Sequence, residues 1–172
     1  MNSDASGSPM LVHVITASDR ASAGVYADLS GPAVAEAVET HFRAEGMAVS
    51  VSREILPDDS DRLAVAMAAA VDKGCRLVVT TGGTGIGHRD LTPEATRKVI
   101  EREIPGLMEE VRRRSAENAP GALLSRAVAG IRGESLIVNL PGSVKAVREC
   151  LGMILPLVPH ALRMAEGGDH DK

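Results

Sequence analysis

Apolar and polar residues follow one another along the first half of the chain in a pattern that predicts strands and helices in turn. Five segments, in the order strand, helix, strand, helix, strand, cover residues 11–17, 30–45, 47–56, 63–71 and 76–81. The helical segments repeat apolar side chains at helical spacing, and the last strand is a β-branched run typical of a central parallel strand buried on both faces. This βαβαβ order predicts a parallel sheet covered by helices.

The second half predicts further helices, each with recognisable ends. Thr92 and Ser143 are expected to cap two of them, since a hydroxyl at that position accepts a backbone N–H of the first turn. Residues 107–117 predict another helix. The last helix must kink or restart at Pro156 and Pro159, because proline cannot continue the hydrogen-bond ladder.

One antiparallel pair is also expected. Residues 126–131 and 134–140 read as the strands of a hairpin, with a two-residue turn at Arg132-Gly133. Together the elements predict the α/β class, with a mostly parallel sheet and an antiparallel edge hairpin.

The length of 172 residues fits one compact domain. The first ten residues are rich in Ser, Gly and Asp and carry neither a basic residue nor an apolar run, so they predict a disordered tail and no signal peptide. We therefore expect a tail over 1–10, a single domain over 11–165 and a short tail over 166–172. A reducing cytoplasm is the expected compartment, and the separated Cys75 and Cys150 are expected to be packed thiols.

Composition excludes several functions. The chain is 44% hydrophobic and 24% charged, which is globular, and no apolar run approaches the ~20 residues of a membrane span. The formal net charge of −4 argues against nucleic-acid binding, which needs a basic face. Only one Phe, one Tyr and no Trp are present, so the core is aliphatic and an aromatic stacking platform is excluded.

Polar residues gather directly after the predicted strands. In an open parallel sheet the ligand lies outside the carboxyl ends of the strands, so these residues are the first candidates for a site. Polar strand ends are also common in loops without function, which leaves each segment ambiguous by itself. The four segments are Ser18-Asp19, Pro57-Asp58, Gly82-Gly83-Thr84-Gly85 and Asn139-Leu140-Pro141-Gly142-Ser143.

The glycine-rich segment is the most specific of the four. Glycines let successive backbone N–H groups converge on an anion, so phosphate is the expected guest of Gly82 to Gly85. The pattern is neither a P-loop nor a dinucleotide fingerprint. Residues 82–91 nevertheless lack regular structure for longer than an ordinary connection, which favours a functional loop.

Two aspartates could complete this site. Asp90 ends the loop, and a carboxylate beside phosphates is favourable only with a cation between them; Mg²⁺ prefers one or two carboxylates plus phosphate oxygens and water. Asp58 could bring a second carboxylate to the same crevice. The alternatives are that Asp90 pairs with Arg89 or stabilises a helix N-terminus, and that Asp58 forms a turn or caps the next helix. The histidines show no zinc-ligand spacing, and no nucleophile elbow occurs.

These residues resemble those of a known family. The likeness covers roughly residues 11–164 and resides in Ser18 to Tyr26, Thr80 to Gly85, Arg89 to Thr96, Leu124-Ser125-Arg126 and Asn139 to Ser143. Together they resemble the molybdenum-cofactor proteins that include the bacterial Mog proteins and the gephyrin G domain. Where relatives often carry a proline before the arginine of the loop, this chain has His88.

The resemblance implies a three-layer α/β/α fold, a homotrimer and a molybdopterin adenylyltransferase. Such an enzyme uses Mg-ATP to adenylate the terminal phosphate of molybdopterin and releases pyrophosphate; hand-over to a molybdenum-insertion protein would follow. The family's two critical aspartates fall on Asp58 and Asp90. A non-catalytic molybdopterin-binding module, B-type or scaffold, is the alternative within the same fold.

The expected mechanism is one of positioning and charge neutralisation. A phosphate monoester is largely dianionic at neutral pH and needs little base catalysis. Mg²⁺ is expected on Asp90 with Asp58 as second ligand or water-mediated partner, and the Gly82 to Gly85 amides are expected to cradle phosphate. Hydrogen bonds to pterin or phosphate are expected from Ser18, Ser125 and Ser143.

Overall fold

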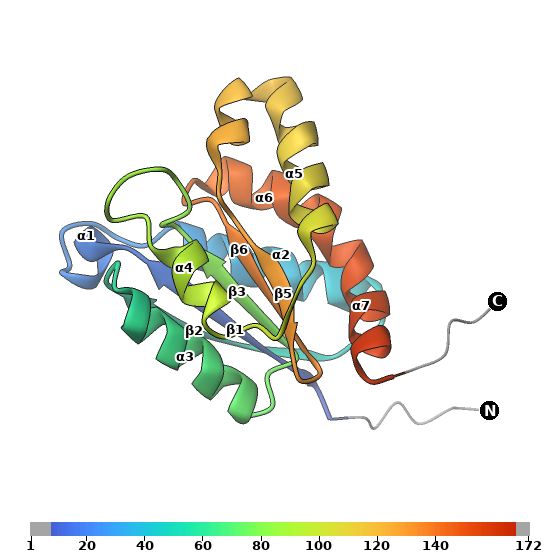
Figure 1. The fold of residues 1–172 in the computed structure, drawn as a ribbon. Coiled ribbons are helices and arrows are strands. Elements are labelled where there is room, and N and C mark those ends of the chain that lie inside the picture. The colour runs from blue at the N-terminus through green and yellow to red at the C-terminus, as the bar shows by residue number, and fades with distance from the viewer. Residues whose placement is uncertain (1–7, 168–172) are drawn as a thin grey trace, which may run out of the picture.

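The computed structural model describes residues 8–167, and a six-stranded sheet forms its centre (Figure 1). The strands are β1 (Met10–Ala17), β2 (Val49–Leu56), β3 (Leu77–Thr81), β4 (Arg102–Glu103), β5 (Ala129–Arg132) and β6 (Ser135–Leu140). In the order β2-β1-β3-β6-β5-β4, the first four run parallel, and β5 and β4 pair antiparallel at one edge. This confirms the predicted sheet with its antiparallel edge.

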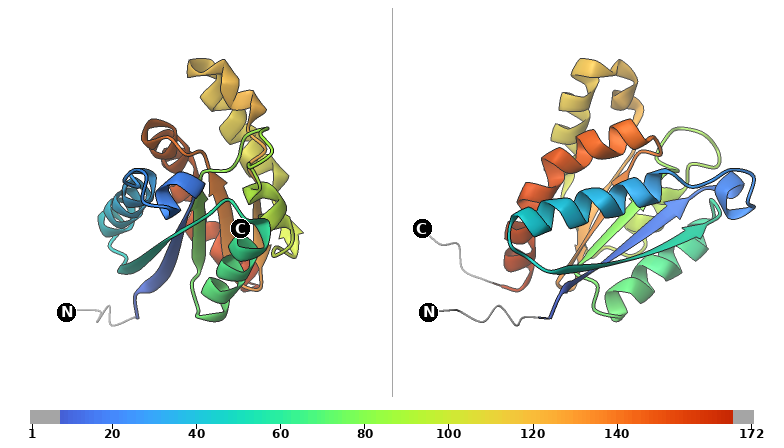
Figure 2. Two further views of the ribbon diagram at one scale, coloured as in Figure 1. Left: turned by 90° about the vertical axis from the view of Figure 1, so that its left-hand side faces the viewer. Right: turned by 180° about the vertical axis from the view of Figure 1, so that it is seen from behind.

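Helices cover both faces of the sheet and complete three layers. They are α1 (Asp19–Ser22), α2 (Ser30–Ala44), α3 (Ser60–Asp72), α4 (Thr92–Arg97), α5 (Pro105–Asn118), α6 (Val144–Ile154) and α7 (Val158–Ala165), with 3₁₀ turns η1 (Pro120–Leu124) and η2 (Leu155–Leu157). The long helices α2 and α6 lie side by side on one face, whereas α3 and α4 cover the other (Figures 1 and 2). The predicted three-layer architecture is confirmed.

Two aliphatic clusters fill the space between the layers. The larger packs α2, α5, α6 and α7 against the sheet, and Phe42 of α2 is fully buried in it. The smaller joins α3 and α4 to the opposite face through side chains such as Leu63 and Met67, both 0% exposed. Every residue of β3 is buried, as its β-branched run predicted. Both cysteines are free and buried, as predicted.

The hairpin and the last helix follow the sequence closely. Pairing of Arg132 with Ser135 places Gly133 and Glu134 in the turn, one residue later than predicted, and the positive φ of Gly133 (55°) explains the shift because glycine adopts that conformation without strain. The first strand of the hairpin, β5, begins at Ala129 and not at residue 126 as predicted, because the N–H of Arg126 donates to the carbonyl of Thr84 in the glycine loop. The helix stops at Ile154, passes through η2 and restarts as α7, as the prolines predicted.

The expected cap at Thr92 is wrong. Thr92 is the first residue of α4 and its side chain makes no cap; its hydroxyl instead donates to the carbonyl of Gly82 at 2.9 Å. The loop of residues 82–91 folds back so that its two ends meet, and the Thr92 hydroxyl joins these ends in place of capping α4. Three short elements, α1, β4 and η1, were not predicted.

Only part of the predicted tails can be placed. Met10, assigned to the tail, pairs with Val49 as the first residue of β1. Residues 1–7 and 168–172 lie outside the described residues. Among residues 8–167, no helix is long and apolar enough to cross a membrane.

A buried amide ties α4 to the sheet. Asn139 of β6 is 0% exposed; its Nδ2 donates to the hydroxyls of Thr80 at 2.9 Å and Thr96 at 2.8 Å, and its Oδ1 accepts the N–H of Val128 at 3.1 Å. Buried polar groups without partners are costly, so these bonds fix where α4 and the segment before β5 lie on the sheet.

Asn139→Ala is expected to lower the free energy of unfolding by about 2–4 kcal/mol, because it leaves the Val128 N–H and two hydroxyls without their partner. Urea denaturation measures the change. Thr80→Val, which removes one partner of the same amide, should cost only about 1 kcal/mol. Equal values for the two variants would contradict the central role of Asn139.

Candidate active site

A cavity of about 460 Å³, the strand-end cavity, opens where β1, β2, β3 and β6 end. Because all four strands are parallel, their carboxyl ends meet at one edge of the sheet. The predicted residues that line this cavity are Ser18, Asp58, Gly82, Gly83, Asp90, Gly142 and Ser143. The structure thus brings Asp58 and Asp90, the two aspartates predicted to be critical, into one cavity.

The other predicted residues lie beside the strand-end cavity or away from it. Asp19 touches Asp58, Thr84 is buried within the loop, and Pro141 accepts a hydrogen bond from the hydroxyl of Thr81 through its carbonyl. Ser125 instead lines a separate hollow beside α5, where its carbonyl faces Arg112. Gly85 is set back within the loop.

Asp19 and Asp58 hold each other in place. The N–H of Asp19 donates to Oδ2 of Asp58 at 2.9 Å, and the N–H of Asp58 donates to Oδ1 of Asp19 at 3.0 Å. The predicted alternative that Asp58 caps the next helix is wrong, because Asp59 accepts the N–H groups of Asp61 and Arg62 there. Both carboxylates are therefore fixed by backbone groups at the ends of β1 and β2.

Charge around these carboxylates is uneven. The guanidinium of Arg89 donates to Asp19 through Nε and Nη2 at 2.9 and 2.8 Å and holds the pKa of Asp19 below its usual value. The alternative in which Arg89 pairs with Asp90 is therefore wrong. Burial raises the pKa of Asp58, and the charges of Asp19 and Asp90 raise it further despite the bond from the Asp19 N–H. The nearby Arg89 charge opposes this rise only in part, and a cation bound beside Asp58 would favour its charged form further.

Asp90 is folded into its own loop. Its N–H donates to the carbonyl of Gly87 at 3.0 Å, and its Oδ2 accepts the N–H of Gly87 at 2.8 Å. A Cβ at Gly85 or Gly87 would lie 2.8 or 2.9 Å from Oδ2, so these two glycines make room for the carboxylate. Oδ1 has no hydrogen-bond partner within residues 8–167.

The first two glycines of the loop serve the turn itself. Gly82 and Gly83 both have positive φ, of 93° and 63°, and a Cβ on Gly82 would lie 2.4 Å from the carbonyl oxygen of Ala17. The Gly82 N–H is used by the carbonyl of Leu140 at 3.1 Å. The N–H groups of Gly83, Thr84 and Gly85 have no protein partner in the described part of the chain, so they are the ones free to meet an anion.

Arg89 and Asp28 also line the strand-end cavity and were not predicted as site residues. Asp28 accepts hydrogen bonds from the hydroxyls of Thr16 and Ser30 and from the N–H of Gly31, at 2.8, 3.1 and 3.0 Å. The Asp-x-Ser-Gly pattern before α2 is a helix-start signal that could have located Asp28. Nothing local indicates that Arg89 reaches residue 19.

The carboxylates suit a metal that takes only part of its shell from protein. Within the described ranges, no three or more Cys, His, Asp and Glu side chains are grouped so that they could hold a metal. Asp58 and Asp90, facing one cavity, are the pair that could hold Mg²⁺, with phosphate and water supplying its other ligands.

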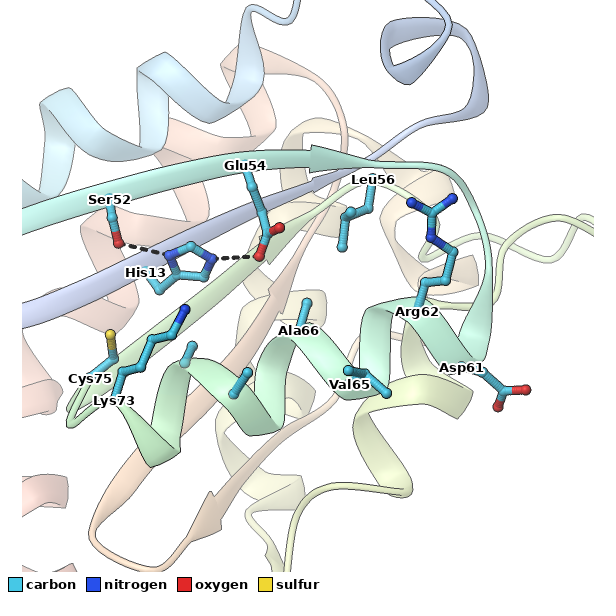
Figure 3. A pocket seen from close by; sticks show the side chains of 12 residues that line it. His13, Ser52, Glu54, Leu56, Asp61, Arg62, Val65, Ala66, Lys73 and Cys75 are labelled. Atoms are coloured by element: carbon cyan, nitrogen blue, oxygen red, sulfur yellow. Dashed lines mark hydrogen bonds and ion pairs between the residues drawn. The ribbon is translucent and has the colours of Figure 1, made fainter.

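A larger hollow of about 730 Å³ lies elsewhere, between β2 and α3 (Figure 3). His13 stands in it between the hydroxyl of Ser52 at 2.7 Å and Oε1 of Glu54 at 2.8 Å. Its walls combine small apolar side chains of α3, such as Ala66 and Ala69, with polar and charged residues, and none of the predicted site residues reaches it. Position at the strand ends, and not size, therefore identifies the candidate site.

An open, mostly parallel sheet with a glycine loop and paired carboxylates at its carboxyl edge defines an α/β protein whose candidate site lies at the strand ends. The family is more specific. Residues 13–160 match the family model described as "Probable molybdopterin binding domain", and the chain belongs to that family. The resemblance inferred from its motifs is confirmed.

Known proteins resemble this chain over most of its length. It is 44% identical over 157 residues to the molybdopterin adenylyltransferase of Helicobacter pylori strain J99, covering 91% of this chain and 88% of the relative. The Mog protein of Mycobacterium ulcerans superposes with a TM-score of 0.84 at 35% identity, and MoaB of Thermus thermophilus with 0.81 at 39%; each covers 94% of this chain and 99% of the other.

Asp58→Asn is expected to stabilise the fold at neutral pH. A carboxyl whose folded-state pKa is raised costs stability as pH rises through that pKa, whereas below the ordinary value near ~4 it is protonated in both states and costs nothing. The melting temperature of the variant should therefore exceed that of the wild type at pH 7.5 and match it near pH 3.5.

Asp19→Asn provides the control of opposite sign. Its lowered pKa means that the charged Asp19 stabilises the fold above its ordinary pKa, so this variant should melt lower at pH 7.5. Thermal scans at both pH values make the comparison. A lower melting temperature for Asp58→Asn at pH 7.5 would contradict the conclusion that the charged Asp58 carboxylate is unfavourable in the fold.

Proposed function

We propose that this protein is a cytoplasmic molybdopterin adenylyltransferase. It transfers AMP from Mg-ATP to the terminal phosphate of molybdopterin and releases pyrophosphate. The observation that carries the proposal is the meeting of Asp58 and Asp90 in one cavity beside unpartnered loop amides. Relatives of 38–44% identity that bear the name molybdopterin adenylyltransferase support the choice of reaction.

The residues fit a reaction that needs positioning more than proton transfer. The attacking phosphate is already dianionic near neutral pH, so no side chain has to act as its base. Asp58 and Asp90 would hold Mg²⁺, which when bound neutralises charge on the nucleotide phosphates. The protein would contribute Oδ1 of Asp90, which has no hydrogen-bond partner in the described part of the chain, and the carboxylate of Asp58, whose charged form burial disfavours until a cation is bound.

Neighbouring groups would orient the substrates. The N–H groups of Gly83, Thr84 and Gly85 have no competing protein acceptor among residues 8–167, and of these residues Gly83 lines the strand-end cavity, where its amide would meet a phosphate. Ser18 and Ser143 line the cavity, although both hydroxyls also cap helices by accepting the N–H groups of Ala21 and Ala146. Ser125 lies in another hollow and is the weakest member of the predicted set.

Asp90→Asn and Asp58→Asn are each expected to reduce pyrophosphate release by orders of magnitude, about 10²–10⁴-fold, because each removes one carboxylate from the cation that offsets developing charge. The assay supplies molybdopterin, ATP and Mg²⁺, and light scattering checks that the assembly is unchanged. Near-normal turnover of both variants would overturn the proposal.

A non-catalytic molybdopterin-binding module is the second candidate, because the chain resembles MoaB and Mog structures about equally well. Calorimetry separates the two. An enzyme should bind Mg-ATP as well as molybdopterin, whereas a module should bind molybdopterin alone and release no pyrophosphate.

The proposal includes a homotrimer that hands its product to a molybdenum-insertion protein. A hollow of about 840 Å³ between α5 and the α6–α7 segment is lined mainly by apolar side chains, and Leu157 and Met164 there are 52% and 47% exposed. Apolar patches of this kind mark association surfaces. We expect this face to be covered by another copy.

Light scattering should give three times the chain mass of 17.9 kDa. Leu157→Glu places a charge in the apolar hollow and should lower that mass, because an unpaired charge buried in an interface is costly. Val65→Glu, at an exposed apolar position on α3 outside this hollow, is the control and should leave the mass unchanged. A wild-type monomer would contradict the trimer.

A further inference from the structure

Arg126 makes three hydrogen bonds to the glycine loop, one through its backbone and two through its guanidinium. It lies between η1 and β5, and its backbone N–H donates to the carbonyl of Thr84 at 2.8 Å. Its guanidinium donates to the carbonyl of Gly85 through Nε at 2.7 Å and to the carbonyl of Asp90 through Nη2 at 2.5 Å. One residue thus holds both ends of the 85–90 segment, the arch between β3 and α4 in Figure 1.

Glu94 fixes the orientation of this guanidinium. It lies in the first turn of α4, and its two carboxylate oxygens accept hydrogen bonds from Nη1 and Nη2 of Arg126. The bonded guanidinium lowers the pKa of Glu94, so the pair stays charged at neutral pH. We call the Arg126–Glu94 pair the clamp. Because α4 is itself bonded to the sheet through Thr96 and Asn139, the clamp is anchored in the core.

The clamp determines how Asp90 presents its carboxylate. The carbonyl of Asp90 is held by Arg126, while its N–H and Oδ2 are held by Gly87. Three polar groups of Asp90 are held in this way. The direction of its remaining oxygen, Oδ1, is therefore set by these bonds and not by a partner of its own. A lysine could not replace the arginine, because a single ammonium lacks the planar fork that reaches two carbonyls and a carboxylate together.

We propose that Arg126 is a positioning residue that sets the orientation of the Asp90 carboxylate for the cation of the reaction. This inference rests on the proposed function. Arg126 is outside the strand-end cavity and acts through the loop backbone, so its loss should weaken metal binding and turnover more than nucleotide binding.

The chain offers a matched control. Arg112 of α5 also donates to backbone carbonyls, those of Ser125 at 3.5 Å and Ala127 at 3.0 Å, but it does not touch the 82–91 loop. Arg112→Lys and Arg126→Lys therefore make the same chemical change in neighbouring places. Glu94→Gln is a second, milder variant that keeps both carbonyl bonds and removes only the charge that orients the guanidinium.

The experiment measures Mn²⁺ binding by electron paramagnetic resonance with a non-hydrolysable ATP analogue present, together with pyrophosphate release. For Arg126→Lys we expect about 10–100-fold weaker Mn²⁺ binding and a similar fall in kcat, with KM for ATP changed less than about threefold, since small misplacements of a catalytic group cost this much. Glu94→Gln should show a smaller change in the same direction, and Arg112→Lys should match the wild type.

The outcomes separate this inference from the function on which it rests. If Arg126→Lys and Arg112→Lys bind Mn²⁺ equally well, Arg126 does not position Asp90, whatever the enzyme does. If the wild type releases no pyrophosphate but Arg126→Lys still weakens Mn²⁺ binding relative to Arg112→Lys, the proposed function fails and the positioning role stands. A rise in KM for ATP with unchanged kcat would also overturn the positioning role.

Discussion

The close approach of three strand ends at Gly82 is the constraint on which the candidate site depends. The N–H of Gly82 bonds to Leu140 at the end of β6, and its missing Cβ leaves room for the carbonyl of Ala17 at the end of β1. Gly142 packs against it from the other side, where a Cβ would lie 3.5 Å from the Cα of Gly82. With any side chain at Gly82, these strand ends would separate, and the residues that follow them would no longer face one cavity.

From this junction the loop is directed by polar groups. Thr92 returns its hydroxyl to the carbonyl of Gly82, and Arg126 holds the far side of the loop through two carbonyls. A loop of ten residues is thereby ordered without secondary structure, and its entropy cost is met by charge-assisted bonds to a residue from a distant part of the chain. The order of this loop therefore depends on Arg126, which precedes the hairpin. The loop residues that line the cavity, Gly83 and Asp90, nevertheless lie at the ends of the parallel strands.

The elements were largely predictable because their signals are local. Apolar spacing located β1, α2, α3 and β3, and the rule that parallel strands share a carboxyl edge brought Asp58 and Asp90 together before any geometry was known. The roles of single residues were harder to predict. Thr92 is a residue type that commonly caps helices, but its hydroxyl is used in a hydrogen bond to the carbonyl of Gly82, ten residues away.

The residues that sequence reasoning missed act over long separations. Arg89 pairs with Asp19 across 70 positions, and Arg126 reaches Gly85 across 41. A spacing pattern cannot show such contacts, because they depend on which loops the topology places side by side. Within the motif Leu124-Ser125-Arg126, a serine hydroxyl is the more obvious ligand for a phosphate or pterin, yet the arginine is the residue that contacts the site loop.

The scarcity of aromatic residues limits how a flat ligand can be held. Phe42 is fully buried in the core, so Tyr26 is the one Phe, Tyr or Trp side chain of the sequence that can reach a ligand. It lines the strand-end cavity, but its hydroxyl is bonded to Ser18 at 2.9 Å and Arg20 lies 5.0 Å from its ring centroid. A heterocycle in this cavity would therefore be recognised by its polar edges and its phosphates, with stacking confined to one ring. That demand explains why backbone amides and carboxylates must be oriented so firmly, since no large apolar contact would hold a misplaced ligand in register.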